Sequence, residues 1–181
     1  LESFKSLENI TREKFLLAKA VSEERLILNI DNDIVRSVSK EFPRAVTVGK
    51  EGLFRISHYR EREDGFDFVL NYVVGGRKER LLLSLPLHGR HNASNAALAA
   101  VVSIMLGVPP RSVRERLASF KGVPHRFEVK KHGGITIIDD GYNSNIEGVR
   151  SGAEAFKRFA GRKVAVAQGL VEAGRERTAL N

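Results

Sequence analysis

Three strand-like segments, separated by two short turns that contain glycine, place the strongest constraint on the fold of this chain. They are residues 54–61 (FRISHYRE), 65–74 (GFDFVLNYVV) and 78–87 (KERLLLSLPL), with REDG and GGRK at the turns. Short turns with glycine are typical of β-hairpins, because glycine adopts the positive φ angles that such turns need. The sequence therefore predicts an antiparallel meander of three strands.

A different pattern precedes the meander. Residues 11–22 have the apolar spacing of a helix, and they are followed by a strand at 25–30, a helix at 33–42 and a strand at 44–50. Strand, helix and strand at this spacing predict a right-handed βαβ unit in a parallel sheet. We therefore expect an α/β fold in which a parallel sheet continues into the antiparallel meander.

The second half of the chain predicts two more helices, a link and a second βαβ unit. The helices are expected from Ala93 to Leu106, closed by Gly107, and over residues 111–120. Beyond the link, KGVPHRFE, we expect a strand entering a polar loop (residues 129–145), a helix (146–160) and a strand (162–170). Because an open α/β sheet usually has more strands, we expect the chain to be a fragment of a longer protein.

Composition excludes several classes of protein. The chain has no cysteine, which excludes disulfides and thiolate metal sites, and its five histidines have no metal-binding spacing. No apolar run approaches the roughly 20 residues of a membrane span, and the first residues lack a secretory signal. We therefore expect a cytoplasmic protein without a membrane span.

The net charge of +8 leaves two interpretations open. Such a charge favours a polyanionic partner, either nucleic acid or a phosphorylated small molecule, or it reflects only a solvated surface. The basic residues are scattered, and no aromatic-and-basic RNA motif is present. Our main expectation is therefore a protein without a nucleic-acid partner. Nucleic-acid binding driven by the net charge is kept as a competing hypothesis.

The segment LPLHGRHNASNAALAA, residues 85–100, begins a helix that is polar only at its start. Asn92 is predicted as the N-cap, and Asn95 then falls at the N3 position. One interpretation is capping alone. The other is a nucleotide facing the first turn, because an Asn amide offers a donor and an acceptor side by side to the N6/N7 edge of adenine.

Two other sites, the pair Asp139-Asp140 and Arg126, have both a functional and a structural interpretation, and Lys14 has a structural one. Asp139 and Asp140 end a strand at the sheet edge where open α/β folds bind ligands. In one interpretation their carboxylates bind a ribose diol, and in the other they only cap the next helix. Arg126 is a phosphate clamp or a solvated residue of the link. Lys14 is expected to extend to water from its helix. A P-loop motif is absent from the sequence, so we expect any P-loop to lie outside this chain.

Five segments, taken together and in order, resemble the Mur ligase family. They are LESFKSLENITREK, LNIDND, GRHNASNAALAA, HRFE and IIDDGYNSN, the last followed by a Gly-Ala-Glu-Ala helix and GLVEAG. The third resembles the Gly-x-His-Asn-x-x-Asn-Ala helix start of the family, and the fifth is most similar to its MurF-type, D-alanyl-D-alanine-adding members. The resemblance implies that residues 1–122 belong to a P-loop-type central ATPase domain, and residues 123–181 to a Rossmann-like C-terminal domain.

The resemblance also implies an activity and a set of substrates. A ligase of this kind uses ATP and Mg²⁺ to phosphorylate a carboxylate, and an amine attacks the acyl phosphate to form an amide. The implied substrates are a UDP-MurNAc-peptide and D-Ala-D-Ala, and the implied role is peptidoglycan synthesis in cell-wall biogenesis, cell shape and cell division, by a monomer. The fragment alone is expected to be inactive. The alternatives are a related ligase of cofactor or archaeal pseudomurein pathways, and a non-catalytic binding module on the same scaffold.

Residue roles follow from the same resemblance. Asn95 resembles the residue that hydrogen-bonds adenine, with His91 and Asn92 around the base. Arg126 resembles the Arg that reaches the ATP phosphates, and Asp140 the Asp that holds the ribose. Lys14 falls where the family often has a carbamylated lysine that supports magnesium. The loop beside Asp140 contributes Tyr142, Asn143 and Asn145.

Overall fold

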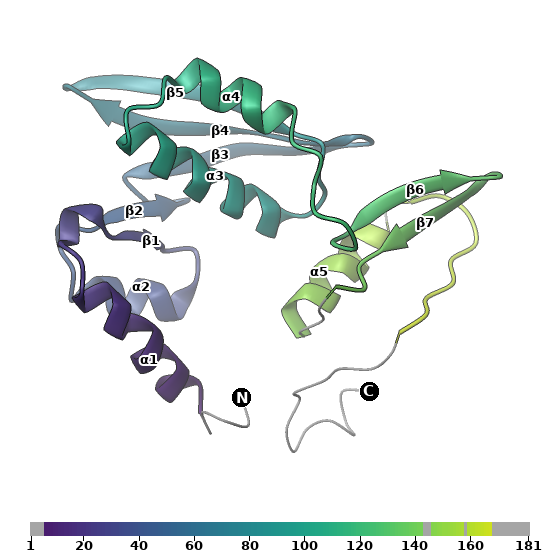
Figure 1. Ribbon diagram of the computed structural model, residues 1–181, viewed down its shortest axis with the longest axis horizontal. Coiled ribbons are helices and arrows are strands. Elements are labelled where there is room, and N and C mark those ends of the chain that lie inside the picture. The colour runs from purple at the N-terminus through teal and green to yellow at the C-terminus, as the bar shows by residue number, and fades with distance from the viewer. Residues whose placement is uncertain (1–5, 143–145, 158, 168–181) are drawn as a thin grey trace. The chain divides into compact units, whose positions relative to one another are not determined.

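The computed structural model describes residues 6–142, 146–157 and 159–167. The chain divides into two compact units, one of residues 15–121 and the other of residues 122–181 with residues 1–14. The elements are α1 (Leu7–Lys19), the 3-10 helix η1 (Glu23–Arg25), β1 (Ile27–Asn29), α2 (Asp33–Ser39), β2 (Val46–Gly49), β3 (Phe54–Arg62), β4 (Gly65–Val74), β5 (Arg77–Leu85), α3 (Arg90–Met105), α4 (Pro110–Ala118), β6 (Glu128–His132), β7 (Ile135–Asp139) and α5 (Ile146–Phe156) (Figure 1). None of the helices described is long and apolar enough to cross a membrane.

A mixed sheet of five strands, in the order β1-β2-β3-β4-β5, forms the centre of the first unit. The pairs β1–β2 and β2–β3 are parallel, and β3–β4 and β4–β5 are antiparallel. The expected βαβ unit and the expected meander are therefore both confirmed. So is the α/β fold, in which parallel and antiparallel pairs share one sheet.

The main core lies between this sheet and α3 and α4, which cover one of its faces (Figure 1). Strand β4 alternates in burial, so that Phe66, Phe68 and Leu70 are fully buried. The side of α3 that faces them consists mainly of alanine, including Ala97 and Ala100, which are also fully buried. Small residues on the helix and large ones on the sheet bring the two elements close together at interior packing density.

A second, smaller core covers the other face of the parallel strands. Successive side chains of a strand point to opposite faces, and in β1 Ile27 packs with the main core while Leu28 belongs to the second. Ala18 of α1 and Phe42, just after α2, are buried with Leu28. The rings of Phe15 and Phe42 stack with their centroids 6.1 Å apart.

Helix α3 ends as expected but begins earlier. Gly107 has φ +83° and donates to the Ile104 carbonyl, and Val108 donates to the Ser103 carbonyl, which is the Schellman arrangement. The helix begins at Arg90 with Gly89 as its N-cap, so the expectation that Asn92 is the N-cap is wrong. The side chain that satisfies this helix end comes from another part of the chain, which local sequence does not reveal.

The second unit contains a two-stranded hairpin where one strand was expected. Strands β6 and β7 pair antiparallel between Glu128 and Asp139. The turn contains Gly133 and Gly134, with φ of +53° and +77°, and this pair of positive φ angles is what a two-residue hairpin turn of type I′ requires. The strand expected at 162–170 is also absent from the described residues 162–167, where Val164 and Val166 are largely exposed. Residues 168–170 lie outside the described residues.

The start of β4 provides a test of the meander. Gly65 is buried with φ +145°, and a Cβ there would overlap the carbonyl oxygen of Leu85. We expect Gly65→Ala to lower the free energy of unfolding by about 3 kcal/mol, because both the backbone strain and the overlap must be relieved. Chemical denaturation followed by circular dichroism measures the change.

The matched control is Gly75→Ala in the β4–β5 turn. Gly75 also has positive φ, +54°, but nothing lies within 4 Å of a Cβ placed there. We expect a loss of about 1 kcal/mol, from backbone strain alone. Equal losses in the two variants would contradict the close approach of Gly65 to Leu85.

Candidate functional site

The start of α3 is held by a carboxylate from β3. The backbone N–H of Gly89 donates to Glu61 Oε1 at 3.1 Å, and His88 Nδ1 lies 3.5 Å from the same oxygen. The side chains of Glu61 and His88 are only 13% and 12% exposed. Glu61 therefore satisfies the N–H of the N-cap residue, Gly89, which is one of the N–H groups at the start of α3 that have no partner within the helix.

A β-bulge brings Glu61 to this position. The β3–β4 register shifts between Ser57 and Arg60, and His58 within the shift has φ +54°. Beyond the bulge, the Tyr59 hydroxyl donates to Glu61 Oε2 at 2.7 Å. The guanidinium of Arg90, the first residue of α3, lies 4.7 Å from the Tyr59 ring centroid. Sequence reasoning missed Tyr59, Glu61 and His88, because a register shift has no signature in the apolar pattern.

The two asparagines of α3 differ in their surroundings. Asn92 is half-buried, and its Nδ2 donates to the His88 carbonyl at 2.8 Å. Asn95 is exposed, and its side chain makes no hydrogen bond to any residue that the structure describes. His91 is exposed as well. The donor of Asn92 thus helps to hold the helix start, whereas both the donor and the acceptor of Asn95 face solvent.

Lys14 lies on an exposed part of α1. Within the described residues no carboxylate forms an ion pair with its ammonium group. This position agrees with a lysine that extends to water, and it leaves the amine accessible to chemical modification.

The second group of predicted residues lies where the link enters the β6–β7 hairpin. His125 and Phe127 both have positive φ, +61° and +49°. The strained backbone is held by two bonds, from Phe127 N to Asp140 Oδ1 at 3.0 Å and from Tyr142 N to the His125 carbonyl at 3.0 Å. The segment that carries Arg126 is therefore tied to the loop that follows β7.

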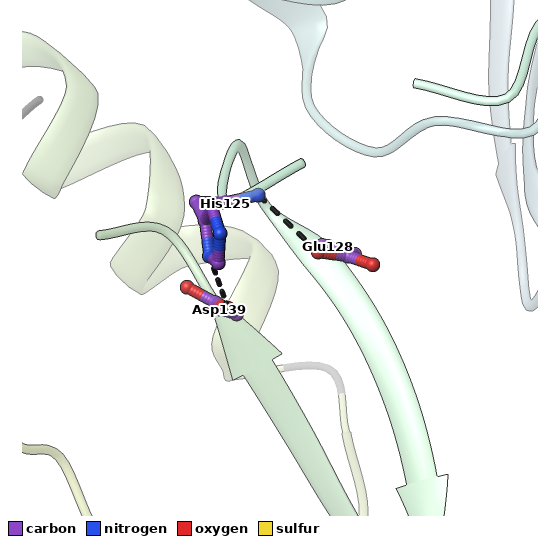
Figure 2. A group of neighbouring side chains, drawn as sticks. All are labelled: His125, Glu128 and Asp139. Atoms are coloured by element: carbon purple, nitrogen blue, oxygen red, sulfur yellow. Dashed lines mark hydrogen bonds and ion pairs between the residues drawn. The ribbon is translucent and has the colours of Figure 1, made fainter. Parts of the chain in front are cut away.

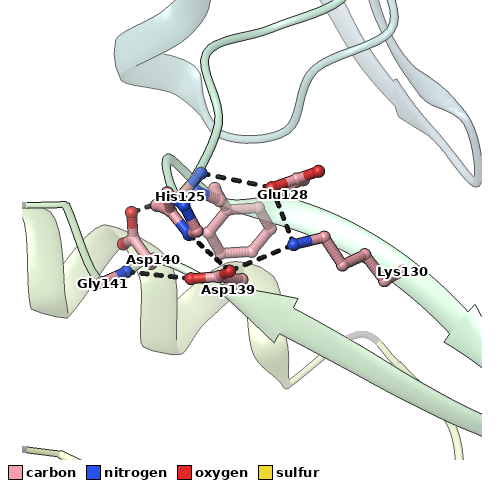
Figure 3. Close-up of polar contacts among 7 residues, drawn as sticks. His125, Glu128, Lys130, Asp139, Asp140 and Gly141 are labelled. Carbon is pink, nitrogen blue, oxygen red and sulfur yellow. Dashed lines mark hydrogen bonds and ion pairs between the residues drawn. The ribbon is translucent and has the colours of Figure 1, made fainter.

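An ion-pair network, defined as His125, Glu128, Lys130 and Asp139, surrounds this junction (Figure 3). Asp139 Oδ2 lies 2.8 Å from His125 Nδ1 and 3.2 Å from Lys130 Nζ. Glu128 Oε2 accepts from the His125 backbone N–H at 3.2 Å and lies 3.0 Å from Lys130 Nζ. Sequence reasoning did not identify this network, since Gly133-Gly134 was not interpreted as the turn that pairs β6 with β7.

The network shifts three pKa values. The hydrogen bond from His125, followed by that from Lys130, holds the pKa of Asp139 below its ordinary value. Lys130, followed by the His125 backbone N–H, lowers the pKa of Glu128. The bonds to Glu128 and then to Asp139 raise the pKa of Lys130. All three side chains therefore stay charged over a wider pH range.

Three members of the network also have the geometry of a possible metal site. One ligand atom each from His125, Glu128 and Asp139 lies within 4.8 Å of the others (Figure 2). However, the ammonium of Lys130 lies between 3.0 and 3.2 Å from one oxygen of each carboxylate. This ammonium group offsets one of the two negative charges and occupies the position between the carboxylates, so we interpret the arrangement as an ion-pair network.

Arg126 and Asp140 are exposed, and each has one internal contact. The Arg126 guanidinium stacks 4.5 Å above the centroid of the Tyr142 ring, which leaves the N–H donors in its plane for other partners. Asp140 uses Oδ1 for Phe127, and Oδ2 lies 3.5 Å from the point where a Cβ on Gly152 would be. The predicted site residues Asn143 and Asn145 lie outside the described residues.

Comparison with known proteins gives consistent results. The Mur ligase middle domain family matches residues 1–103, more than half of the chain. UDP-N-acetylmuramoyl-tripeptide--D-alanyl-D-alanine ligase of Escherichia coli (strain K12) is 27% identical over 97% of this chain and 40% of that protein. UDP-N-acetylmuramate--L-alanine ligase of Anaeromyxobacter sp. (strain Fw109-5) is 38% identical over 74% of this chain and 30% of that protein.

A solved structure extends the likeness to the fold. The MurF ligase of Thermotoga maritima, crystallised in complex with ADP, has a TM-score of 0.77 and 27% identity. The match covers 98% of this chain and 41% of that protein. This chain therefore spans about two fifths of the length of the MurF-type proteins that it resembles.

The ion-pair network predicts a pH dependence for the second unit. Because the pKa of Asp139 is lowered on folding, its contribution to stability is complete above the ordinary pKa of about 4 and disappears as the pH falls through the folded value. We expect the side-chain carboxyl carbon of Asp139 to titrate by NMR below that pH. In Lys130→Met the midpoint of the Asp139 titration should move to higher pH, because one of the hydrogen bonds that lower its pKa is lost.

The matched control is Lys131→Met. Lys131 is the next residue of β6 and points to the opposite face of the hairpin. We expect it to leave the titration of Asp139 unchanged. An Asp139 midpoint at the ordinary value in the unmodified protein would exclude the network.

Proposed function

The chain belongs to the Mur ligase family, and from this premise we propose that it is the nucleotide-binding part of an ATP-dependent ligase of peptidoglycan synthesis. The proposed reaction joins D-Ala-D-Ala to a UDP-MurNAc-peptide, in the cytoplasm and with the protein as a monomer. We assign residues 1–122 to the central ATP-binding domain and residues 123–181 to the start of the C-terminal domain. The MurF-type assignment is supported by relatives that align over nearly the whole chain.

The observation that carries the proposal is the exposed amide of Asn95 near the anchored start of α3. Adenine presents a donor and an acceptor side by side, and an Asn amide pairs with both. Asn95 keeps both groups available, whereas Asn92 uses its donor on the His88 carbonyl. We therefore assign base recognition to Asn95, with His91 beside it and Asn92 as a support of the turn.

The reaction brings anions together, so its remaining requirements are electrostatic. Transfer of the γ-phosphoryl group of ATP to the substrate carboxylate forms an acyl phosphate and releases ADP, and an amine then attacks the acyl carbon, expels phosphate and forms the amide. We assign Arg126 to the ATP phosphates, because its guanidinium is exposed and held by its stack on Tyr142. Asp140, with Tyr142, Asn143 and Asn145 in the same loop, is assigned to the ribose side of the nucleotide.

Lys14 has a more specific requirement. Mg²⁺ binds oxygen ligands, and an ammonium group repels it. Lys14 therefore fits a magnesium site only as a carbamate, a modification that its exposed position allows. We assign it this role, and every other step depends on nucleotide contacts rather than on the metal.

A second candidate is a Mur-type ligase that adds a different amine. It is favoured by the higher identity, 38%, to the L-alanine ligase over a shorter part of the chain. The residues assigned above bind nucleotide and therefore do not distinguish amines. Purified protein from the complete reading frame is assayed for ADP release with UDP-MurNAc-tripeptide and, separately, with UDP-MurNAc. Dependence on the tripeptide and D-Ala-D-Ala supports the first candidate, and dependence on one amino acid with either acceptor supports the second.

The same assay tests a non-catalytic binding module. A protein that binds ATP but releases no ADP with any amine would support that alternative.

A separate measurement tests the nucleic-acid alternative. Binding of duplex DNA at physiological salt, with a steep salt dependence, would support a nucleic-acid partner.

The first prediction from the proposal concerns the adenine contact. We expect Asn95→Ala in the complete protein to raise the KM for ATP about tenfold, because a paired hydrogen bond to the base is lost. The melting temperature should not change, since the Asn95 side chain is exposed. Ser103→Ala, on the last turns of the same helix, is the control and should leave KM unchanged. An unaltered KM in Asn95→Ala would remove the adenine assignment.

The second prediction concerns the phosphate contact. We expect Arg126→Lys to lower kcat about tenfold, because lysine keeps the charge but loses the planar fork and the stack on Tyr142. Arg150→Lys, at an exposed position of α5, is the matched control. Steady-state kinetics with saturating ATP measure the difference, and equal rates in the two variants would show that Arg126 is only a surface residue.

A further inference from the structure

Glu61 occupies a position that neither the sequence motifs nor the family match assigns. It is an acidic residue near the end of β3, yet its side chain is largely buried and both of its oxygens accept hydrogen bonds. Burial of a carboxylate is unfavourable unless it is paired or hydrogen-bonded. The contacts of Glu61 are therefore specific, and they converge on the first turn of α3.

The first set of contacts fixes the backbone where α3 begins. Glu61 Oε1 accepts the N–H of Gly89, whose φ of +91° places it outside the helix. The carbonyl of the preceding residue, His88, accepts Nδ2 of Asn92 at 2.8 Å. The imidazole of His88 contacts Glu61 as well. One carboxylate thus holds two consecutive residues, and one of these orients Asn92.

The second set of contacts fixes Glu61 itself. The hydroxyl of Tyr59 donates to Oε2, and the Tyr59 ring lies against Phe66 of β4, with centroids 5.6 Å apart. Arg90 covers the ring of Tyr59. Since Phe66 is fully buried, the hydrogen-bonded chain connects the rigid core of the sheet to the start of α3.

We propose that Glu61 is a positioning residue for base recognition, acting through Gly89 and His88 on the first turn of α3, which contains Asn92 and leads into the turn that carries Asn95. This inference rests on the proposed function, because it assumes that Asn95 contacts the nucleotide base. It goes beyond that function by placing the control of base affinity in a strand residue that does not itself touch the nucleotide.

The test compares Glu61→Ala, Glu61→Gln and Tyr59→Phe in the protein expressed from its complete reading frame. Glu61→Ala removes both acceptors, and we expect the KM for ATP to rise about tenfold with kcat within about twofold. Glu61→Gln keeps an acceptor for Gly89 and a partner for Tyr59, so it should recover most of the affinity. Tyr59→Phe removes only one hydroxyl, and we expect a rise of about threefold.

Two further measurements separate positioning from general destabilisation. The matched control Glu79→Ala removes an exposed glutamate of β5 near the β4–β5 turn, and it should leave KM unchanged. Amide hydrogen exchange should speed up at Gly89 and Asn92 in Glu61→Ala, with the exchange of buried β4 unaltered. Faster exchange throughout the sheet would overturn the inference, because it would show a loss of folding rather than of position.

The outcomes distinguish this inference from the function on which it rests. If the unmodified protein does not bind ATP or ADP, the proposed function fails. If it binds ATP and Glu61→Ala leaves both KM and the exchange of the first turn unchanged, only the role of Glu61 fails. A raised KM that glutamine restores supports the inference.

Discussion

The close packing of α3 on the five-stranded sheet is the constraint on which the rest of the first unit depends. Ala97 and Ala100 allow the helix backbone to approach the rings of Phe66 and Phe68, because short side chains add no distance between the layers. This packing fixes the rotation of α3 about its own axis, because any other rotation would place larger side chains between the helix and the sheet. The side chains at its start are therefore presented in one direction.

The second unit is held in a different way. Phe127 is the one apolar residue that is buried among the described residues after 121, so hydrophobic burial contributes little there. Backbone bonds to Asp140 and to the His125 carbonyl fix the segment that carries Arg126. The surrounding ion pairs are exposed, and such pairs are individually weak. Their value lies in orientation, because they hold four side chains around one strained turn.

Sequence reasoning succeeded where a pattern is local. The glycine turns of the meander, the βαβ unit and the Schellman end at Gly107 all depend on neighbouring residues, and each is present in the structure. It failed where the partner is distant. The acceptor for the N–H of Gly89, the N-cap residue of α3, is Glu61, which lies 28 residues earlier in the chain. Its direction is set by a bulge that the apolar pattern does not reveal. The asparagine motif was recognised, but the different surroundings of Asn92 and Asn95 are visible only in the coordinates.

The charge at the start of α3 also limits what this helix end can bind. The N-terminal end of a helix carries a partial positive charge and commonly binds phosphate. Here Glu61 already accepts the N–H of Gly89, so a carboxylate occupies part of the position that an anion would take. Such an end is better suited to a neutral base than to a triphosphate. The phosphates of a bound nucleotide must then find their cations elsewhere, which is the role proposed for Arg126 and, through magnesium, for a carbamylated Lys14.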